Sequence, residues 1–168
     1  GPYISSWYDN GQKEEENNWK DGKLHGKWIV WFENGQKASE NTYKDDKPHG
    51  LWALWSENGL RKTQKHYQDG KLHGRSIRWF ENGQKREEEH YQKDKKHGRS
   101  IRWYENGQKE KEVNYKKGKL MSAVSWKPNG EKCPVTNVKK GNGVVVEYNE
   151  DGTEARRDTY KDGERVRD

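Results

Sequence analysis

Short apolar and aromatic runs alternate with polar runs along the whole chain. In one example, the run KWIVWF at 27–32 is followed by ENG at 33–35 and by QKASENTY at 36–43. Asn-Gly between two such runs is a strong hairpin signal, because Asn and Gly adopt a positive φ at low cost. We therefore predict a strand, a tight turn and a returning strand. The segment KDDKPHG at 44–50 is predicted to be a longer connection to the next hairpin.

This pattern recurs with a fixed period. Asn-Gly pairs begin at residues 10, 34, 58, 82, 106 and 129, Asp-Gly begins at 151, and His-Gly begins at 25, 49, 73 and 97. Steps of 24 residues, which shorten to 23 and 22 near the end, indicate stacked copies of one supersecondary unit. No segment sustains a 3.6-residue apolar period, so almost no helix is expected. The predicted fold is all-β: an elongated antiparallel meander of six to seven stacked β-hairpin repeats in a single twisted or rolled sheet.

Most aromatic residues fall into three columns when the copies are aligned on the turn Asn or Asp. The first column, three residues before it, holds Trp7, Trp31, Trp55, Trp79, Trp103, Trp126 and Tyr148. The second, nine residues after it, holds Trp19, Tyr43, Tyr67, Tyr91, Tyr115, Val138 and Tyr160. The third, two residues before it, holds Tyr8, Phe32, Phe80 and Tyr104, with Ser56 as the exception. We expect side chains of the intervening strands to bridge the first column into a continuous ladder.

The length of the turn decides which face each column occupies. A two-residue turn at Asn34-Gly35 would put Trp31 and Tyr43 on opposite faces. A three-residue turn that begins at Glu33, with Gly35 left-handed and a bulge, would put them on one face. We favour the three-residue turn, because it makes one face aromatic in every copy. A further column then joins that face: Ile29, Ala53, Ile77, Ile101 and Val124.

Composition and charge exclude several classes of protein. Only 27% of the 168 residues are hydrophobic and 37% are charged, which alone favours disorder, but nine Trp and nine Tyr indicate a fold built on aromatic side chains. The net charge is +6, yet acids and bases alternate, so no nucleic-acid partner is expected. A single cysteine, Cys133, excludes an intramolecular disulfide and a cysteine-based zinc site. No apolar run reaches the ~18–20 residues of a membrane span.

The repeated polar residues do not favour catalysis or metal binding. Equivalent strand positions in adjacent hairpins are about twice the strand spacing apart, too far for His25, His49, His73 and His97 to share a metal ion. We expect His-Gly to shape a turn and to hydrogen-bond the backbone. Glu16, Glu40, Glu88 and Glu112 lie near a Lys/Arg column, and charge pairing explains both. We therefore expect no enzyme activity, no catalytic residues, no metal and no cofactor.

The informative positions are those where the copies differ. Two positions alternate with Ile29 and Trp31, and so point to the other face. They hold bulky apolar residues in two copies, then Ser and Arg in the next two. The hypothetical partner-binding residues are Trp28, Val30, Trp52, Leu54, Arg75, Arg78, Arg99 and Arg102. Trp and Arg are favoured at binding hot spots. The alternative is that Trp28 and Trp52 pack under a neighbouring segment, such as the divergent C-terminal region.

The run WKDGKLHGKWIVWFENGQK, residues 19–37, resembles the variant class of the MORN repeat that is common in bacterial proteins. The resemblance covers residues 3–125 well. It covers 126–168 less well, where Met121-Ser122 replaces His-Gly and PNGEKCPVTNVKKGNG at 128–143 departs from the pattern. The predicted organisation is an expression-tag scar at 1–2, regular repeats at 3–125, and a divergent C-terminal region or cap at 126–168.

The resemblance implies a β-hairpin array without catalytic machinery. Such proteins are often described as antitoxin components of bacterial toxin–antitoxin pairs, and related arrays as membrane- or protein-binding scaffolds. The leading hypothesis is a scaffold that binds another protein, of antitoxin or immunity type, with a toxin or effector as the partner. The alternatives are a carbohydrate or cell-wall module and a scaffold associated with anionic lipid. The compartment is left open: the cytoplasm is favoured, and export or lipid anchoring is compatible with a missing native N-terminus.

Overall fold

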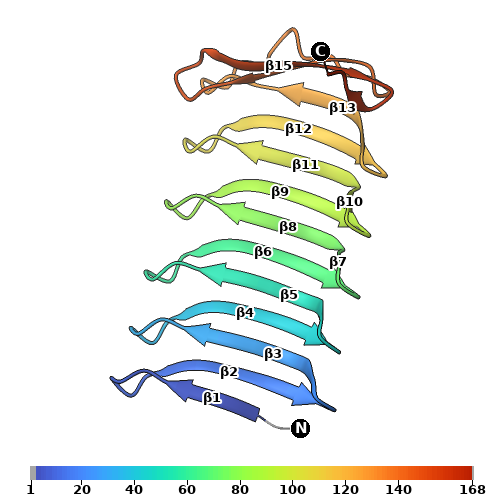
Figure 1. Ribbon diagram of the computed structural model, residues 1–168. Helices are drawn as coiled ribbons and strands as arrows, with labels where there is room; N and C mark the ends of the chain where they lie inside the picture. The colour runs from blue at the N-terminus through green and yellow to red at the C-terminus, as the bar shows by residue number, and fades with distance from the viewer. Residues whose placement is uncertain (1–2, 168) are drawn as a thin grey trace. The chain divides into compact units, whose positions relative to one another are not determined.

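The computed structural model describes residues 3–167, and this range contains no helix. No described segment is therefore a helix able to cross a membrane. Strands β1 to β13 follow one another in chain order in one antiparallel sheet, and β14 to β16 form a second, three-stranded sheet (Figure 1). The predicted all-β meander of hairpin repeats is confirmed. The chain divides after Gly83 into two compact units, each described here by itself, and the predicted tag scar at residues 1–2 lies outside the described range.

The strands are short and closely matched in length from copy to copy. In the first unit they are β1 (Tyr3–Trp7), β2 (Lys13–Lys20), β3 (Lys23–Trp31), β4 (Lys37–Lys44), β5 (Lys47–Trp55), β6 (Arg61–Gln68), β7 (Lys71–Leu72) and β8 (Gly74–Trp79). In the second unit they are β9 (Lys85–Gln92), β10 (Lys95–Lys96), β11 (Gly98–Trp103), β12 (Lys109–Lys116), β13 (Lys119–Ser125), β14 (Gly143–Tyr148), β15 (Glu154–Lys161) and β16 (Glu164–Arg165). β7 and β8 are separated only by His73, and β10 and β11 only by His97.

The Asn-Gly turns have the predicted three-residue form. At the turn between β3 and β4, the Gly35 amide donates to the Phe32 carbonyl at 2.9 Å, and the Phe32 amide donates to the Gln36 carbonyl at 2.8 Å. Gly35 has a φ of +84°, the left-handed conformation in which a residue with a Cβ is strained. The turn is therefore a type I turn closed by a glycine bulge, as expected from the spacing.

The predicted assignment of aromatic columns to faces is wrong, because a second bulge follows the turn. Trp31 is paired with Lys37, but Val30 is paired with Ser39, so Ala38 is an extra residue. One extra residue reverses the side-chain alternation of everything beyond it. Tyr43 consequently lies on the face opposite Trp31.

The segment predicted as a long connection at 44–50 is instead a two-residue turn. Lys44 pairs with Lys47, and the turn residues Asp45 and Asp46 both have positive φ, of 50° and 67°. Two consecutive positive φ values define a type I′ turn, whose twist matches that of the flanking strands. β5 therefore begins at Lys47, within the segment expected to be a connection.

The first two His-Gly pairs lie within strands, at an irregularity, and the third and fourth interrupt a strand; none lies in a turn as expected. In the pairing of β4 with β5, Asn41 is opposite Trp52 and Tyr43 is opposite Pro48. Three residues, 49–51, therefore face the single residue Thr42. The equivalent shift occurs in the pairing of β2 with β3.

Hydrogen bonds link the Asn-Gly turns at Asn10, Asn34 and Asn106 to the turn of the next copy. The Asn34 side-chain amide donates to the Glu57 carbonyl at 2.7 Å, while its Oδ1 accepts from the Gln36 amide at 2.9 Å. Asn10 and Asn106 donate in the same way to the next turn. Each of these Asn side chains thus closes its own turn and holds the following one.

The opposite edge of the sheet has its own links between copies. The Gly70 amide donates to the Pro48 carbonyl at 2.8 Å, and the Asp69 amide donates to Nδ1 of His49 at 3.2 Å. In the second unit, the Lys117 amide donates to Nδ1 of His97 at 3.1 Å. The expectation that these histidines hydrogen-bond the backbone is confirmed at His49 and His97.

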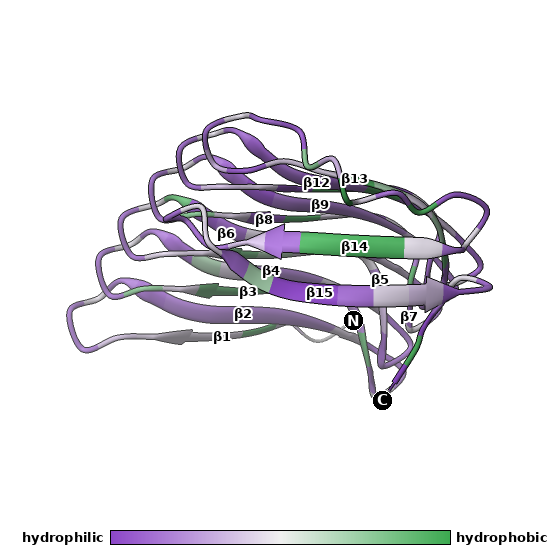
Figure 2. Cartoon of the chain, turned by 90° about the horizontal axis from the view of Figure 1, so that it is seen from above, coloured by the Kyte–Doolittle hydropathy of each residue, from purple (hydrophilic) through white to green (hydrophobic). Residues whose placement is uncertain are grey.

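The most apolar part of the described chain lies where the three-stranded sheet covers β12 and β13. Val145 on β14 packs in one cluster with Val113, Leu120, Ala123 and Val138. β14 is the strand with the longest green stretch in Figure 2, whereas β15 is mostly purple. The divergent C-terminal region therefore packs on the last strands of the repeat sheet within its own unit.

The Asn links make a testable prediction about stability. Asn34→Asp keeps the acceptor of the turn but removes the donor to Glu57, and we expect a loss of about 1 kcal/mol in the free energy of unfolding. Asn34→Ala removes both bonds and should cost more. Asp151 occupies the equivalent position in the turn between β14 and β15, where its Oδ1 accepts from the Thr153 amide. Urea unfolding of the two variants measures these costs, and equal stability of Asn34→Asp and the parent would contradict the role of the donor.

Candidate functional site

One face of the sheet carries a ladder of alternating Trp and Tyr rings, here called the ladder face. In the first unit the ring centroids of Trp28 and Tyr43 are 6.1 Å apart, those of Tyr43 and Trp52 are 5.5 Å apart, and those of Trp52 and Tyr67 are 5.2 Å apart. The rings are tilted by 41–56°, within the range that aromatic pairs favour over flat stacking. These rings are partly buried, so they stabilise the sheet and also form part of its surface.

The predicted Trp ladder lies on the opposite face, here called the ion-pair face, and its rings are bridged by lysines. Lys13 Nζ lies 5.5 Å from the Trp31 ring, and Lys37 Nζ lies 6.0 Å from the Trp55 ring. Each lysine comes from the strand between two Trp residues, as the sequence predicted for the bridging side chains. Ile29, only 8% exposed, shares this face with Trp31, as expected.

The Glu and Lys columns are paired, but along one strand. Lys37 Nζ lies 3.3 Å from Glu40, and the equivalent pair Lys85–Glu88 is 2.9 Å apart. Residues three apart on a regular strand would point to opposite faces. The bulge at Ala38 brings them to the same face, so the bulge is also what makes the ion pairs possible.

Glu40 is the carboxylate most enclosed by these pairs, with a side chain 10% exposed. Lys27 Nζ lies 2.9 Å from it, from the neighbouring strand. This ammonium lowers the pKa of the Glu40 carboxyl below its usual value, and Lys37 adds to the effect, although burial acts in the other direction. The repeated Glu column is therefore a set of ionised, paired groups.

Four of the predicted partner-binding residues form one strip on the ladder face of the first unit. Trp28 and Val30 lie on β3, and Trp52 and Leu54 lie on β5, with Ser39 between Val30 and Leu54. Leu54 is 44% exposed, which is unusual for an aliphatic side chain flanked by ordered strands. The strip is thus apolar and reachable from solvent.

The four predicted arginines do not form one group. Arg78 lies on the ladder face, opposite Thr63 on β6. Arg75 alternates with it and so lies on the ion-pair face. In the second unit, Arg99 pairs with Glu112 at 2.9 Å on the ion-pair face, while Arg102 lies on the ladder face, 3.3 Å from Glu87. The sequence expectation that Arg75 and Arg99 belong with Arg78 and Arg102 is therefore wrong in placement, because strand alternation separates them.

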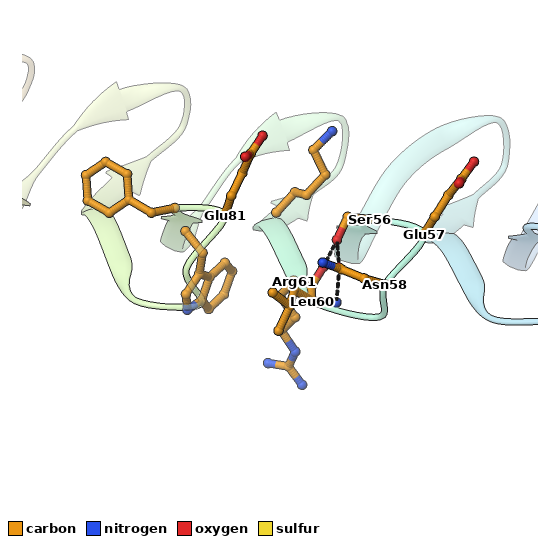
Figure 3. Close-up of a pocket in the computed structure, with 9 residues that line it drawn as sticks. Ser56, Glu57, Asn58, Leu60, Arg61 and Glu81 are labelled. Atoms are coloured by element: carbon orange, nitrogen blue, oxygen red, sulfur yellow. Dashed lines mark hydrogen bonds between the residues drawn. The ribbon is translucent and has the colours of Figure 1, made fainter. Parts of the chain in front are cut away.

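A pocket of about 360 Å³ lies at the Asn-Gly edge of the first unit, between the third and fourth turns (Figure 3). Ser56, Leu60 and Arg61 line it from one copy, and Trp79 and Phe80 line it from the next. The Ser56 hydroxyl bonds to Asn58 and to the Leu60 carbonyl, so it stays within its own turn (Figure 3). The sequence marked Ser56 as the exception in its column but gave no role to it.

No group of three or more His, Cys, Asp or Glu side chains suited to a metal ion occurs within 3–167. Four of the six histidines, His49, His66, His90 and His97, contact backbone groups through Nδ1. The Nδ1 atoms of His66 and His90 lie 3.2 Å and 2.8 Å from the Arg75 and Arg99 carbonyls. Cys133 is buried and accepts a hydrogen bond from the Tyr148 hydroxyl at 3.1 Å.

Comparison with known proteins gives one family. The sequence model of the MORN repeat variant matches residues 24–45, 72–93 and 96–117. Each match spans an Asn-Gly turn and the strands on either side of it, and ends at the first residue of the following type I′ turn. Three segments of the chain therefore match the MORN repeat variant, a family of non-enzymatic repeat scaffolds. A search of curated proteins finds no match.

The ion pairs make stability depend on pH in a defined direction. The Glu40 pKa is lowered in the folded state, so its stabilising effect is complete above the unfolded pKa of ~4.3 and is lost as the pH falls through the folded value. Glu40→Gln should destabilise the protein by about 1–2 kcal/mol near neutral pH and much less near pH 2. Chemical denaturation at both pH values checks this. The exposed Glu33→Gln is the control, and a pH-independent effect of Glu40→Gln would exclude the ion pairs as its cause.

The ring ladder makes a second stability prediction. Trp52→Ala removes contacts to Tyr43 and Tyr67 and the indole bond to the Thr42 carbonyl, and should cost about 2–4 kcal/mol. Trp7→Ala, at a ring 59% exposed, should change stability by less than about 0.5 kcal/mol. Thermal unfolding distinguishes the two, and similar effects would show that the ladder does not hold the sheet.

Proposed function

We propose that this chain is a non-catalytic scaffold that binds another protein through the apolar strip on its ladder face. MORN repeats are in general protein- or lipid-binding modules. The observation that carries the proposal is the exposed Leu54 side chain beside the half-buried Val30, Trp28 and Trp52. These positions vary between copies, whereas the turn residues and the ion-pair column repeat.

The chemistry of the strip favours a protein partner. Trp side chains supply large contact area at low entropic cost, and a neighbouring Arg, such as Arg78, is typical of protein-binding hot spots. An exposed aliphatic group next to aromatic rings gains most from a partner that excludes water from it. The strip alternates with Ser39 and Thr63, which can supply hydrogen bonds between the apolar contacts.

The charge distribution supports a protein over an anionic membrane. A lipid-binding face needs basic residues concentrated on one side. Lysines on the ion-pair face are matched by carboxylates, as in Lys13–Glu16 at 2.6 Å and Lys37–Glu40. The ladder face of the first unit presents mainly apolar and neutral polar side chains. Neither face therefore offers an excess of free positive charge in the described contacts.

The aromatic rings also argue against a carbohydrate-binding function. Sugar sites use ring faces that are open for stacking. Here the rings of Tyr43 and Trp52 each pack between two neighbouring rings whose centroids are 5.2–6.1 Å away, and all four rings are half-buried. The resemblance to antitoxin-type proteins adds a specific partner class to the proposal, namely a toxin or effector that the scaffold binds as an antitoxin or immunity protein.

The strip is tested by two charge insertions. Val30→Lys with Leu54→Lys places two ammonium groups in the strip, and we expect at least tenfold weaker partner binding with little change in melting temperature, since Leu54 is exposed. Leu51→Lys is the matched control, because Leu51 lies on the same strand but alternates to the ion-pair face. Affinity capture from the source cells identifies the partner, and calorimetry with the purified partner measures the loss.

Three outcomes would contradict the proposal. One is equal binding by the parent and the double variant. Another is loss of binding in Leu51→Lys alone, which would move the interface to the ion-pair face. The third is binding to anionic vesicles or peptidoglycan in the absence of any stoichiometric protein partner.

A further inference from the structure

The pocket beside Ser56 occupies the place where other copies hold an aromatic ring. Two residues before the turn Asn, the column has Tyr8, Phe32, Phe80 and Tyr104, and only Ser56 among the five regular copies lacks a ring. Ser56 fills a fraction of the volume of a phenol or phenyl side chain. The pocket of about 360 Å³ opens where that ring would lie.

The other copies show what this place accepts. The Tyr8 hydroxyl donates to the Trp31 carbonyl at 2.7 Å, and the Tyr104 hydroxyl donates to the Trp126 carbonyl at 2.8 Å. Tyr8, Phe32 and Phe80 are half-buried in this slot, and Tyr104, which also lies near the C-terminal strands, is 3% exposed, so the slot accepts a phenol or phenyl ring. By the same spacing, the carbonyl available to a ring beside Ser56 is that of Trp79.

A second substitution makes the same turn more apolar. Gln occurs two residues after the turn Asn in four copies, at Gln12, Gln36, Gln84 and Gln108, and Leu60 replaces it in the third. Leu60 is 38% exposed and lies over Gly83 of the next turn. The copy that lacks the ring has therefore also exchanged a polar amide for an exposed aliphatic group at the same pocket.

The lining of the pocket suits a neutral aromatic group. Trp79 and Phe80 supply aromatic surface, and the Arg61 guanidinium can lie against a ring as the lysines of other copies lie against Trp. Glu57 and Glu81 at the rim offset the charges of Arg61 and its neighbour Lys62. This balance gives no preference for an anionic phenol, such as a phosphorylated tyrosine.

We propose that the pocket beside Ser56 binds an aromatic side chain, preferably tyrosine, presented by the protein partner. The ring packs against Trp79, Phe80 and Leu60, and its hydroxyl donates to the Trp79 carbonyl. The inference deepens the proposed function, since it names the partner residue that the scaffold recognises. The partner completes the aromatic column that this chain leaves open at one copy.

The pocket can be tested without the partner. p-Cresol is the side-chain analogue of tyrosine, and a fragment of this size is expected to bind with a Kd of about 1 mM. In an NMR titration, we expect a saturable shift of the Trp79 indole N–H. Ser56→Tyr fills the slot from within, so it should abolish this shift and raise the melting temperature by several degrees. Ser56→Phe should also abolish the shift, with a smaller gain in melting temperature because it lacks the hydroxyl.

A further variant and a control ligand complete the test. Phe32→Ser should open an equivalent slot at the second turn and add a saturable shift at Trp55. 4-Methylcyclohexanol has the same hydroxyl and methyl groups on a saturated ring and should bind at least threefold more weakly than p-cresol. Equal binding of the two compounds, or a Trp79 shift that persists in Ser56→Tyr, would overturn the proposal.

The proposal for the pocket and the proposal for the strip can be refuted separately. Binding of p-cresol at Trp79, with partner binding unaffected by the change at Leu54, would refute the strip and leave the pocket standing. Partner binding that requires Leu54 but is unchanged in Ser56→Tyr, with no p-cresol binding, would refute the pocket alone.

Discussion

The fold depends on hydrogen bonds that tie turns to the turns of the next copy at both edges of the sheet. On one edge, an Asn amide such as that of Asn34 reaches the next turn's carbonyl, and on the other edge His49 and Pro48 accept from the following type I′ turn. With only 27% hydrophobic residues, burial alone offers little to fix the spacing of the strands. Polar links at both edges set the spacing between copies. Because this spacing is regular, equivalent aromatic and charged side chains lie in columns.

Bulges then sort side chains between the two faces. The extra residue Ala38 sends Tyr43 to the ladder face and, at the same time, brings Lys37 and Glu40 together on the other. One inserted residue per copy therefore places the rings of Tyr43 and Trp52 together on the ladder face, and places Lys37 near both Glu40 and the Trp55 ring on the ion-pair face. It also leaves variable positions such as Leu54 open to a partner.

Much of the fold could be predicted from the sequence, and each feature that was missed has its own physical reason. The strands, the three-residue turn at Asn34 and the columns follow from spacing, since turn chemistry and repetition act locally. The bulge at Ala38 has no such signal, because an alanine fits a regular strand equally well. The type I′ turn at Asp45-Asp46 does have a signal in the sequence, since the equivalent positions of other copies hold Asp-Gly pairs, at 21–22 and 69–70, which favour this turn. The face of Arg75 followed from strand alternation alone, and the pocket at Ser56 needed the positions of the neighbouring rings.

The coupling of neighbouring turns has an evolutionary consequence. Duplicating or deleting a complete 24-residue segment leaves every Asn donor with a carbonyl to meet, so such changes preserve the whole pattern of links. Gain or loss of one residue within a segment displaces a donor from its acceptor at one edge. Related arrays should consequently differ in length by whole numbers of 24-residue segments. Single-residue insertions and deletions should be confined to the divergent ends.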